Sequence, residues 1–249
     1  MWRKHHRAQE HLRPCATTHQ PASRRRVRGS RGKNTLLGLL LLPMLALTSM
    51  GSITSSASAQ GTAHARINLA SKLHAPAIAP ASPPVGFVEF CDRYPEECRP
   101  IGRPTTFQIR LTPTRWDLIR QVNAYINRKV KPLTDQEIYN RPEVWEYPTS
   151  GVGDCEDYVL LKKRYLEALG FPPEALLIAV VLDENGGGHA VLLVRTDRGD
   201  FALDNRRNRI LPWNRTGYTY LLRQSQRDPG QWVAITRNPA IKPKVYGNN

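Results

Sequence analysis

The stretch 176-LLIAVVLDENGGGHAVLLVRTDRGDFALD-204 decides the fold, because it contains three short apolar runs separated by turns. The runs occupy residues 176–182, 189–195 and 200–204. The segments between them are rich in Gly, Asn and Asp, which is typical of tight turns. Short apolar runs joined in this way predict consecutive antiparallel strands, and we expect a fourth strand at 231–235.

Two helices are predicted before these strands. Residues 154–169 carry an apolar side that includes Leu166 and Leu169, and Gly170 follows as a stop signal. Residues 112–130 begin with Thr-Pro and carry apolar residues at spacings of three and four, the pattern of an amphipathic helix. Helices followed by an antiparallel meander predict an α+β domain.

The first 59 residues have the pattern of a signal peptide. Residues 1–33 carry ten Lys/Arg and one acid, the apolar run 36-LLGLLLLPMLAL-47 follows, and Ala57-Ser58-Ala59 supplies a small-residue cleavage site. The apolar run is shorter than the ~20 residues that cross a bilayer as a helix. A retained membrane anchor and a later translation start remain alternatives. We expect cleavage after Ala59 and export to the periplasm or the exterior.

Removal of residues 1–59 changes what the charge of the chain implies. The whole sequence has a net charge of +15, but residues 60–249 keep 26 Lys/Arg and 20 Asp/Glu, a net charge of +6. No nucleic-acid-binding motif accompanies that charge, and we expect no nucleic-acid partner. Residues 60–84 are rich in Ala, Pro and Ser and predict a disordered linker, with the folded domain at 85–249.

The cysteines divide by their place in the chain. Cys15 leaves with the leader, so the exported protein keeps Cys91, Cys98 and Cys155. Cys91 and Cys98 flank a proline turn in 91-CDRYPEEC-98, and an oxidising compartment favours their pairing as a disulfide. Cys155 is then the odd cysteine, either buried and inert or kept for chemistry.

The surroundings of Cys155 act on its thiol in opposite directions, because Asp154, Glu156 and Asp157 would raise the thiol pKa whereas the helix start would lower it. A cysteine in the first turn of a helix has backbone N–H groups and the positive end of the helix dipole beside its sulfur, which stabilises the thiolate. His189 opens one predicted strand and Asp204 ends the next, so the two are neighbours in a meander and Asp204 can orient the imidazole. Cys155, His189 and Asp204 therefore predict a nucleophile, a base and an orienting carboxylate.

Several short strings resemble the bacterial transglutaminase-like cysteine peptidases. They are Gly-Asp-Cys-Glu-Asp at 153–157 with Lys162 downstream, His-Ala-Val-Leu at 189–192, Leu-Asp-Asn at 203–205, Trp213, Phe90-Cys91 with Cys98, and the pair Asn123 and Asn127. The resemblance covers roughly residues 86–236. It implies a papain/transglutaminase-type core, a periplasmic location, a protein substrate and a Cys-His-Asp triad formed by the three residues above.

The resemblance also gives the acidic residues around Cys155 a role. In its LapG-type branch, acids that flank the cysteine bind a calcium ion that activity requires, which by position implies Asp154 and Glu156, with Asp157 as a further ligand. Hard oxygen ligands suit Ca²⁺. The same branch implies a large surface adhesin as substrate and an inner-membrane cyclic di-GMP receptor as regulator. Alternatively, these acids only cap the helix and complement its dipole.

An acyl-transfer site also needs a donor for the oxyanion. The backbone N–H of Cys155 is the first expectation, because it lies at a helix N-terminus. Trp145 resembles the aromatic residue near the site in transglutaminase folds and is a second candidate donor, although tryptophans in such loops more often pack in the core. The basic segment 205-NRRNRILPWNR-215 predicts a solvated turn or a contact for an acidic partner or substrate.

Two other functions remain open for the same residues. Thioester chemistry at Cys155 also supports transglutamination or amide hydrolysis of cell-wall peptides. A non-catalytic, calcium-dependent binding module could keep the same fold. Replacement of Cys155 by alanine separates these classes, because an enzyme loses turnover whereas a binding module keeps its affinity.

Overall fold

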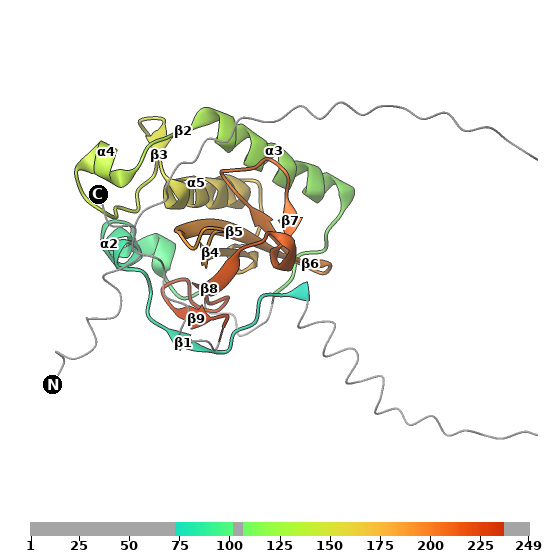
Figure 1. Ribbon diagram of the computed structural model, residues 1–249. Coiled ribbons are helices and arrows are strands. Elements are labelled where there is room, and N and C mark those ends of the chain that lie inside the picture. Colours follow the sequence, from blue (N-terminus) through green and yellow to red (C-terminus); the bar gives the residue numbers. More distant parts are fainter. Residues whose placement is uncertain (1–72, 102–106, 237–249) are drawn as a thin grey trace, which may run out of the picture.

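The computed structural model of the protein describes residues 73–101 and 107–236, and its centre is an antiparallel seven-stranded sheet of order β1-β9-β8-β4-β5-β6-β7 (Figure 1). The strands of this sheet are β1 (Ala79–Ala81), β4 (Leu176–Leu182), β5 (Gly188–Thr196), β6 (Gly199–Leu203), β7 (Leu211–Pro212), β8 (Thr219–Gln224) and β9 (Trp232–Ala234). A separate parallel pair joins β2 (Lys131–Pro132) to β3 (Val152–Gly153).

The predicted meander is confirmed as β4, β5 and β6. All seven residues of β4 are buried, because both faces of the sheet are covered. Leu176, Ile178 and Val180 belong to the core under the helices, whereas Leu177 and Ala179 belong to a second apolar cluster on the opposite face. The continuous apolar runs in the sequence therefore reflect a sheet that is buried on both sides.

The carboxyl-terminal strands differ in one respect from the expectation. The strand expected at 231–235 is present as β9, but β8 lies between it and β4 and was not predicted. The β8 sequence, TYLLRQ, mixes polar and apolar residues, and its register against β4 shifts between Val180 and Val181. Its buried polar side chains bond to the backbone: Gln224 Oε1 accepts a hydrogen bond from the Ile178 N–H at 3.1 Å.

The α-helices are α2 (Val85–Arg93), α3 (Pro113–Lys129), α4 (Asp135–Tyr139) and α5 (Cys155–Ala168), and short 3-10 turns are η2 (Pro95–Cys98), η3 (Pro173–Ala175) and η4 (Trp213–Arg215). Both predicted helices are confirmed as α3 and α5. Figure 1 shows α5 against the sheet beside β5, with α3 on its outer side. Leu169 departs from the prediction, because it lies just after the last turn of α5 and is 47% exposed.

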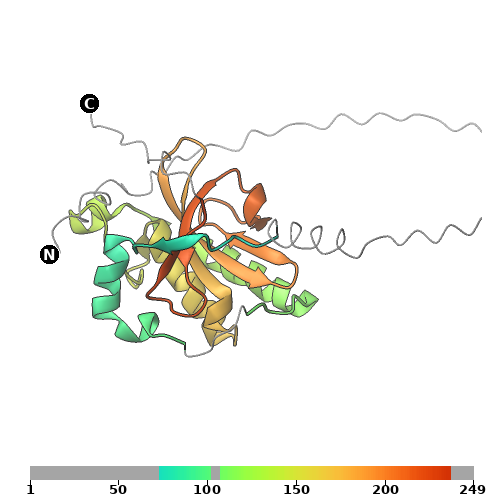
Figure 2. The same ribbon diagram turned by 90° about the horizontal axis from the view of Figure 1, so that it is seen from below.

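The end of the predicted linker belongs to the domain, which corrects the boundary expected at residue 85. β1 pairs with β9 along the edge of the sheet, as Figure 2 also shows. Ala75 is buried: its N–H donates to Asp200 Oδ2 at 2.8 Å, and its carbonyl accepts from Arg195 and Arg223. These backbone contacts fix a segment whose composition alone predicts disorder.

The disulfide predicted between Cys91 and Cys98 is present, with their Cα atoms 5.7 Å apart. Within the described ranges, no helix combines the length and apolar character that crossing a membrane requires. The predicted signal peptide at 1–59 and the linker up to residue 72 lie outside the described residues.

Candidate active site

Cys155 is the first residue of α5 and is 2% exposed. Its Sγ accepts a hydrogen bond from the backbone N–H of Ala190, which neighbours His189 on β5, at 3.2 Å. Glu156 Oε2 lies 3.0 Å from the same sulfur. Cys155 is disulfide-bonded in this structure, so nucleophilic chemistry requires its reduced form.

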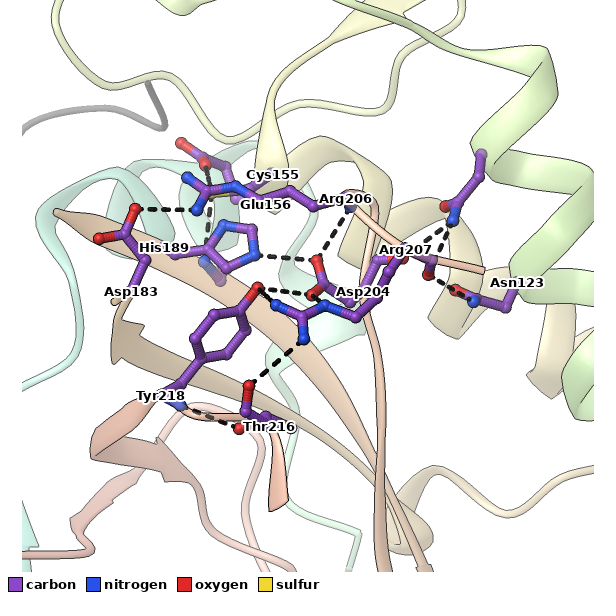
Figure 3. A network of polar contacts seen from close by, with 12 residues as sticks. Asn123, Cys155, Glu156, Asp183, His189, Asp204, Arg206, Arg207, Thr216 and Tyr218 are labelled. Carbon is purple, nitrogen blue, oxygen red and sulfur yellow. Dashed lines mark hydrogen bonds and ion pairs between the residues drawn. The ribbon is translucent and has the colours of Figure 1, made fainter. Parts of the chain in front are cut away.

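His189 and Asp204 are brought together by the register of β5 and β6. Leu192 is opposite Leu203, so Asp204 follows on the same face as His189. His189 Nε2 lies 3.0 Å from Asp204 Oδ1, and both side chains are buried (Figure 3). Because an ionised carboxylate only accepts hydrogen bonds, this contact assigns the proton of a neutral imidazole to Nε2 and leaves Nδ1 as an acceptor.

Several donors hold the Asp204 carboxylate. Tyr218 donates its hydroxyl to Oδ2 at 2.7 Å, Arg207 Nε lies 3.0 Å from Oδ2, and the Arg206 N–H donates to Oδ1 at 3.0 Å. Burial alone would raise the pKa of Asp204, but the hydrogen bond and charge of His189, with the Arg206 and Tyr218 donors, bring it well below its ordinary value. Asp204 is therefore ionised throughout the physiological pH range.

Burial lowers the pKa of His189 below its ordinary 6.5, and the Asp204 carboxylate opposes this effect. The imidazole is consequently neutral near pH 7, which is the form that can accept a proton. Its ring also makes an edge contact with Tyr218, with the ring centres 5.4 Å apart. Tyr218 thus fixes both the ring and its carboxylate partner.

A second group of buried acids lies at the start of α5. Asp135, Asp154 and Asp157 are buried, and each offers a carboxylate oxygen within 4.8 Å of the others. Asp157 Oδ1 accepts from the Glu146 N–H at 2.9 Å, and Asp135 Oδ2 accepts from the Val144 N–H. Four further oxygens have no hydrogen-bond partner among the described residues: Asp135 Oδ1, both Asp154 oxygens and Asp157 Oδ2.

This cluster is electrostatically strained. Burial, with smaller contributions from the neighbouring acids, raises the pKa of Asp154 to about 7 and that of Asp157 to about 9. Burial also raises the pKa of Asp135 to about 6. Unpaired buried carboxylates of this kind are costly unless a proton or a cation neutralises them.

The structure brings together only part of the ligand set expected from the sequence. Asp154 and Asp157 lie in the cluster, whereas Glu156 is positioned against the Cys155 sulfur. Burial, followed by repulsion from Asp154, raises the pKa of Glu156 well above its ordinary value. Asp135, which the sequence analysis missed, completes the cluster.

The position of Asp135 follows from the parallel pairing of β2 with β3. Lys131 is opposite Val152 and Pro132 is opposite Gly153, which places the start of α4 beside the start of α5. The sequence signal near Asp135 is a capping box formed by Thr134 and Glu137, which indicates only a helix start. Tyr218 was missed in the same way, because it precedes the strand that was not predicted.

The indole N–H of Trp145, the second candidate oxyanion donor, already has a hydrogen-bond acceptor in this structure. Its indole N–H donates to Glu143 Oε1 at 3.0 Å, and its ring packs on Phe87 and Trp232, with ring centres 5.4 and 6.2 Å away. The side chain is 2% exposed. These contacts give Trp145 a packing role beside the acidic residues, and the backbone N–H of Cys155 remains the predicted oxyanion donor.

A family model and several solved structures match this chain. The model of a family described as bacterial transglutaminase-like cysteine proteinase matches residues 77–240. Among solved structures, calcium-bound LapG of Legionella pneumophila is 25% identical, with a TM-score of 0.43 over 52% of this chain and 74% of that chain. Another structure of LapG is 24% identical, with a TM-score of 0.42 over 50% of this chain and 71% of that chain.

An EGTA-treated form of the same Legionella protein is also similar, at 25% identity and a TM-score of 0.42 over 50% of this chain and 69% of that chain. Among curated proteins, none matches the chain.

Proposed function

The chain belongs to the bacterial transglutaminase-like cysteine proteinase family and is a cysteine peptidase, and from that premise we propose that Cys155, His189 and Asp204 form its catalytic triad. The observation that carries the proposal is the convergence of three elements. The start of α5 supplies the sulfur, the start of β5 supplies the imidazole, and the residue after β6 supplies the carboxylate. The 3.0 Å contact from His189 to Asp204 and the Ala190 N–H on the Cys155 sulfur link them.

In this mechanism the reduced Cys155 gives its proton to Nδ1 of His189 and attacks a peptide carbonyl. Asp204 stabilises the imidazolium that forms, while Tyr218 and Arg207 hold Asp204 in place. The backbone N–H of Cys155 donates to the oxyanion. His189 then protonates the leaving amine, and water releases the acyl group from the sulfur.

A calcium ion bound by Asp135, Asp154 and Asp157 is part of the proposal. Several orphaned, buried carboxylate oxygens within reach of one another fit a hard divalent cation. Backbone carbonyls and water would complete its shell. When bound, the ion supplies positive charge that neutralises the cluster at the helix start that carries Cys155. Glu156, which contacts the Cys155 sulfur, lies between Asp154 and Asp157 in the sequence, so the triad and the acidic cluster share one segment of the chain.

The substrate class is protein, which follows from the peptidase family. The family resemblance adds three finer proposals, namely a periplasmic location, a large surface adhesin as substrate and an inner-membrane cyclic di-GMP receptor as regulator. The triad does not depend on these three proposals.

The test is the rate at which iodoacetamide alkylates Cys155 in the reduced protein at pH 7, with the modified residue identified by peptide mass spectrometry. A thiolate activated by His189 is expected to react about thirtyfold faster than an ordinary thiol, which is only a few per cent ionised at this pH. His189→Ala is expected to remove that advantage. His74→Ala, whose imidazole contacts the Thr196 carbonyl, is the matched control and should keep it.

The alkylation assay is repeated in the presence of calcium and in the presence of EGTA. Calcium is expected to accelerate the reaction and EGTA to slow it, because the ion neutralises the acids beside the thiolate. A slow reaction that ignores both His189→Ala and calcium would contradict the triad and leave a binding module. Protein cleavage that Cys155→Ala abolishes separates peptidase activity from mere thiol reactivity.

A further inference from the structure

A groove of about 860 Å³ lies beside α3, away from the residues used in the triad and the acidic cluster. Its walls come from α3, from the end of α5 and from residues 208–210, which follow Asp204 by a few positions. We call it the α3 groove. No step of the proposed mechanism uses it.

The groove has an apolar side that is accessible to solvent. Tyr125 and Leu169 line it and are 41% and 47% exposed. The half-buried Tyr165 lies next to Tyr125, with the ring centres 5.7 Å apart. This cluster offers a surface on which an apolar or aromatic side chain of a partner can pack.

The groove also has a positively charged side. Arg120, Arg128 and Arg209 line it and are exposed, and none of the described residues that line the groove is acidic. Arg120 lies 3.9 Å from Asp117 at the outer surface, a contact too long and too exposed to neutralise it. Within the described ranges, neither Arg128 nor Arg209 has an ion pair. Among the described residues the groove therefore carries unneutralised positive charge, which is complementary to an acidic ligand.

The groove is connected to the triad through one loop. Asn127 Nδ2 donates to the Asp204 carbonyl at 2.9 Å, and Asn123 Nδ2 donates to the Arg207 carbonyl at 3.3 Å, so α3 holds the chain that runs from Asp204 to the groove (Figure 3). The four peptide steps from Asp204 to Asn208 span at most roughly 14 Å. A peptide chain in the active site can cover a distance of this order with a handful of extended residues.

We propose that the α3 groove is an exosite that binds an acidic segment of the protein substrate, with an apolar or aromatic side chain of that segment packed on Tyr125 and Leu169. This inference rests on the proposed peptidase function. The charge complementarity selects acidic segments over basic ones, and the short loop places the segment within reach of the scissile bond. The segment 205–215, singled out in the sequence for its arginines, contributes Arg209 to this surface, whereas its Arg206 and Arg207 bind Asp183 and Asp204.

The test measures, by fluorescence anisotropy, how a fluorescein-labelled peptide of repeated Glu-Glu-Leu binds to the Cys155→Ser protein. A Lys-Lys-Leu peptide tests the contribution of charge, and a Glu-Glu-Gly peptide tests the contribution of apolar contact. The double substitution Arg120→Glu with Arg128→Glu is expected to weaken binding by about tenfold or more, and added salt should weaken it further. Tyr125→Ala tests the apolar side. Arg99→Glu, the same substitution at an exposed residue outside the groove, is the matched control for Arg120→Glu and Arg128→Glu made singly.

Preferential binding of Glu-Glu-Leu that the groove substitutions remove and the control keeps would support the exosite. Equal loss in the Arg99→Glu control would overturn it, because it would indicate attraction to the overall positive charge. Absence of binding, or equal binding of the three peptides, would also overturn it. Alkylation of Cys155, measured in parallel on the same substitutions with the thiol present, reports on the triad separately, so failure of the exosite is distinguishable from failure of the peptidase mechanism.

Discussion

Calcium binding to this protein is expected to release protons. Replacement of Asp157 by asparagine is expected to lower the number of protons released by nearly one. The pKa values of Asp135, Asp154 and Asp157 are raised by burial to about 6, 7 and 9. At pH 7, Asp157 is then almost fully protonated, Asp154 about half and Asp135 about a tenth. If calcium requires all three carboxylates in ionised form, its binding releases about one and a half protons.

The same shifts determine how the calcium-free fold responds to pH. An acid whose folded pKa is raised binds more protons in the folded than in the unfolded state between the two values, so stability falls as pH rises through that window. For Asp157 the window runs from its ordinary 3.8 to about 9, and at pH 7 the loss is about 4 kcal/mol. Calcium is expected to reverse this loss by binding only the folded state.

Isothermal titration calorimetry in two buffers of different ionisation enthalpy measures the proton release directly. We expect about one and a half protons for the unchanged protein at pH 7 and about half a proton for Asp157→Asn, with weaker calcium binding. Asp117→Asn makes the same chemical change at an exposed carboxylate and should leave both quantities unchanged. Calcium binding that is independent of pH from 6 to 8, or proton release that Asp157→Asn does not alter, would refute the reasoning.

Three further substitutions test single contacts. Gly153→Ala places a Cβ 2.6 Å from Asp157 Oδ2, so this carboxylate must move and calorimetry should record weaker calcium binding. Tyr218→Phe removes the hydroxyl on Asp204 and is expected to slow Cys155 alkylation at pH 7 by about tenfold, with rescue by higher pH; an unchanged rate would show that Tyr218 does not hold the triad. Burial lowers the pKa of Lys162 from 10.5 to about 7, so Lys162→Met should raise the free energy of unfolding in urea by at most about 4 kcal/mol at pH 7, a gain that fades toward pH 10.5; a loss of stability would show that the Tyr158 ring and the Asp204 charge outweigh the cost of burying this lysine.

The sequence by itself determined the local elements and the residues in their first turns. Apolar periodicity predicted α3, α5 and the three strands of the meander, because these signals depend on neighbours along the chain. The same reasoning predicted a helix start at Cys155, and a strand start at His189 beside a strand end at Asp204. Composition failed at residues 73–84, where order comes from backbone contacts with Arg195, Asp200 and Arg223 that lie more than a hundred positions away.

The tertiary structure decided which side chains meet. Asp154 and Asp157 are three residues apart at a helix start and share one side, whereas Glu156 turns toward the sulfur, so a run of adjacent acids divides between two sites. Asp135 reaches the cluster through the pairing of β2 with β3, and Tyr218 reaches Asp204 from the chain before β8. Long-range pairing of this kind leaves no periodic trace in the sequence, because each partner satisfies only its own local pattern until the chain folds.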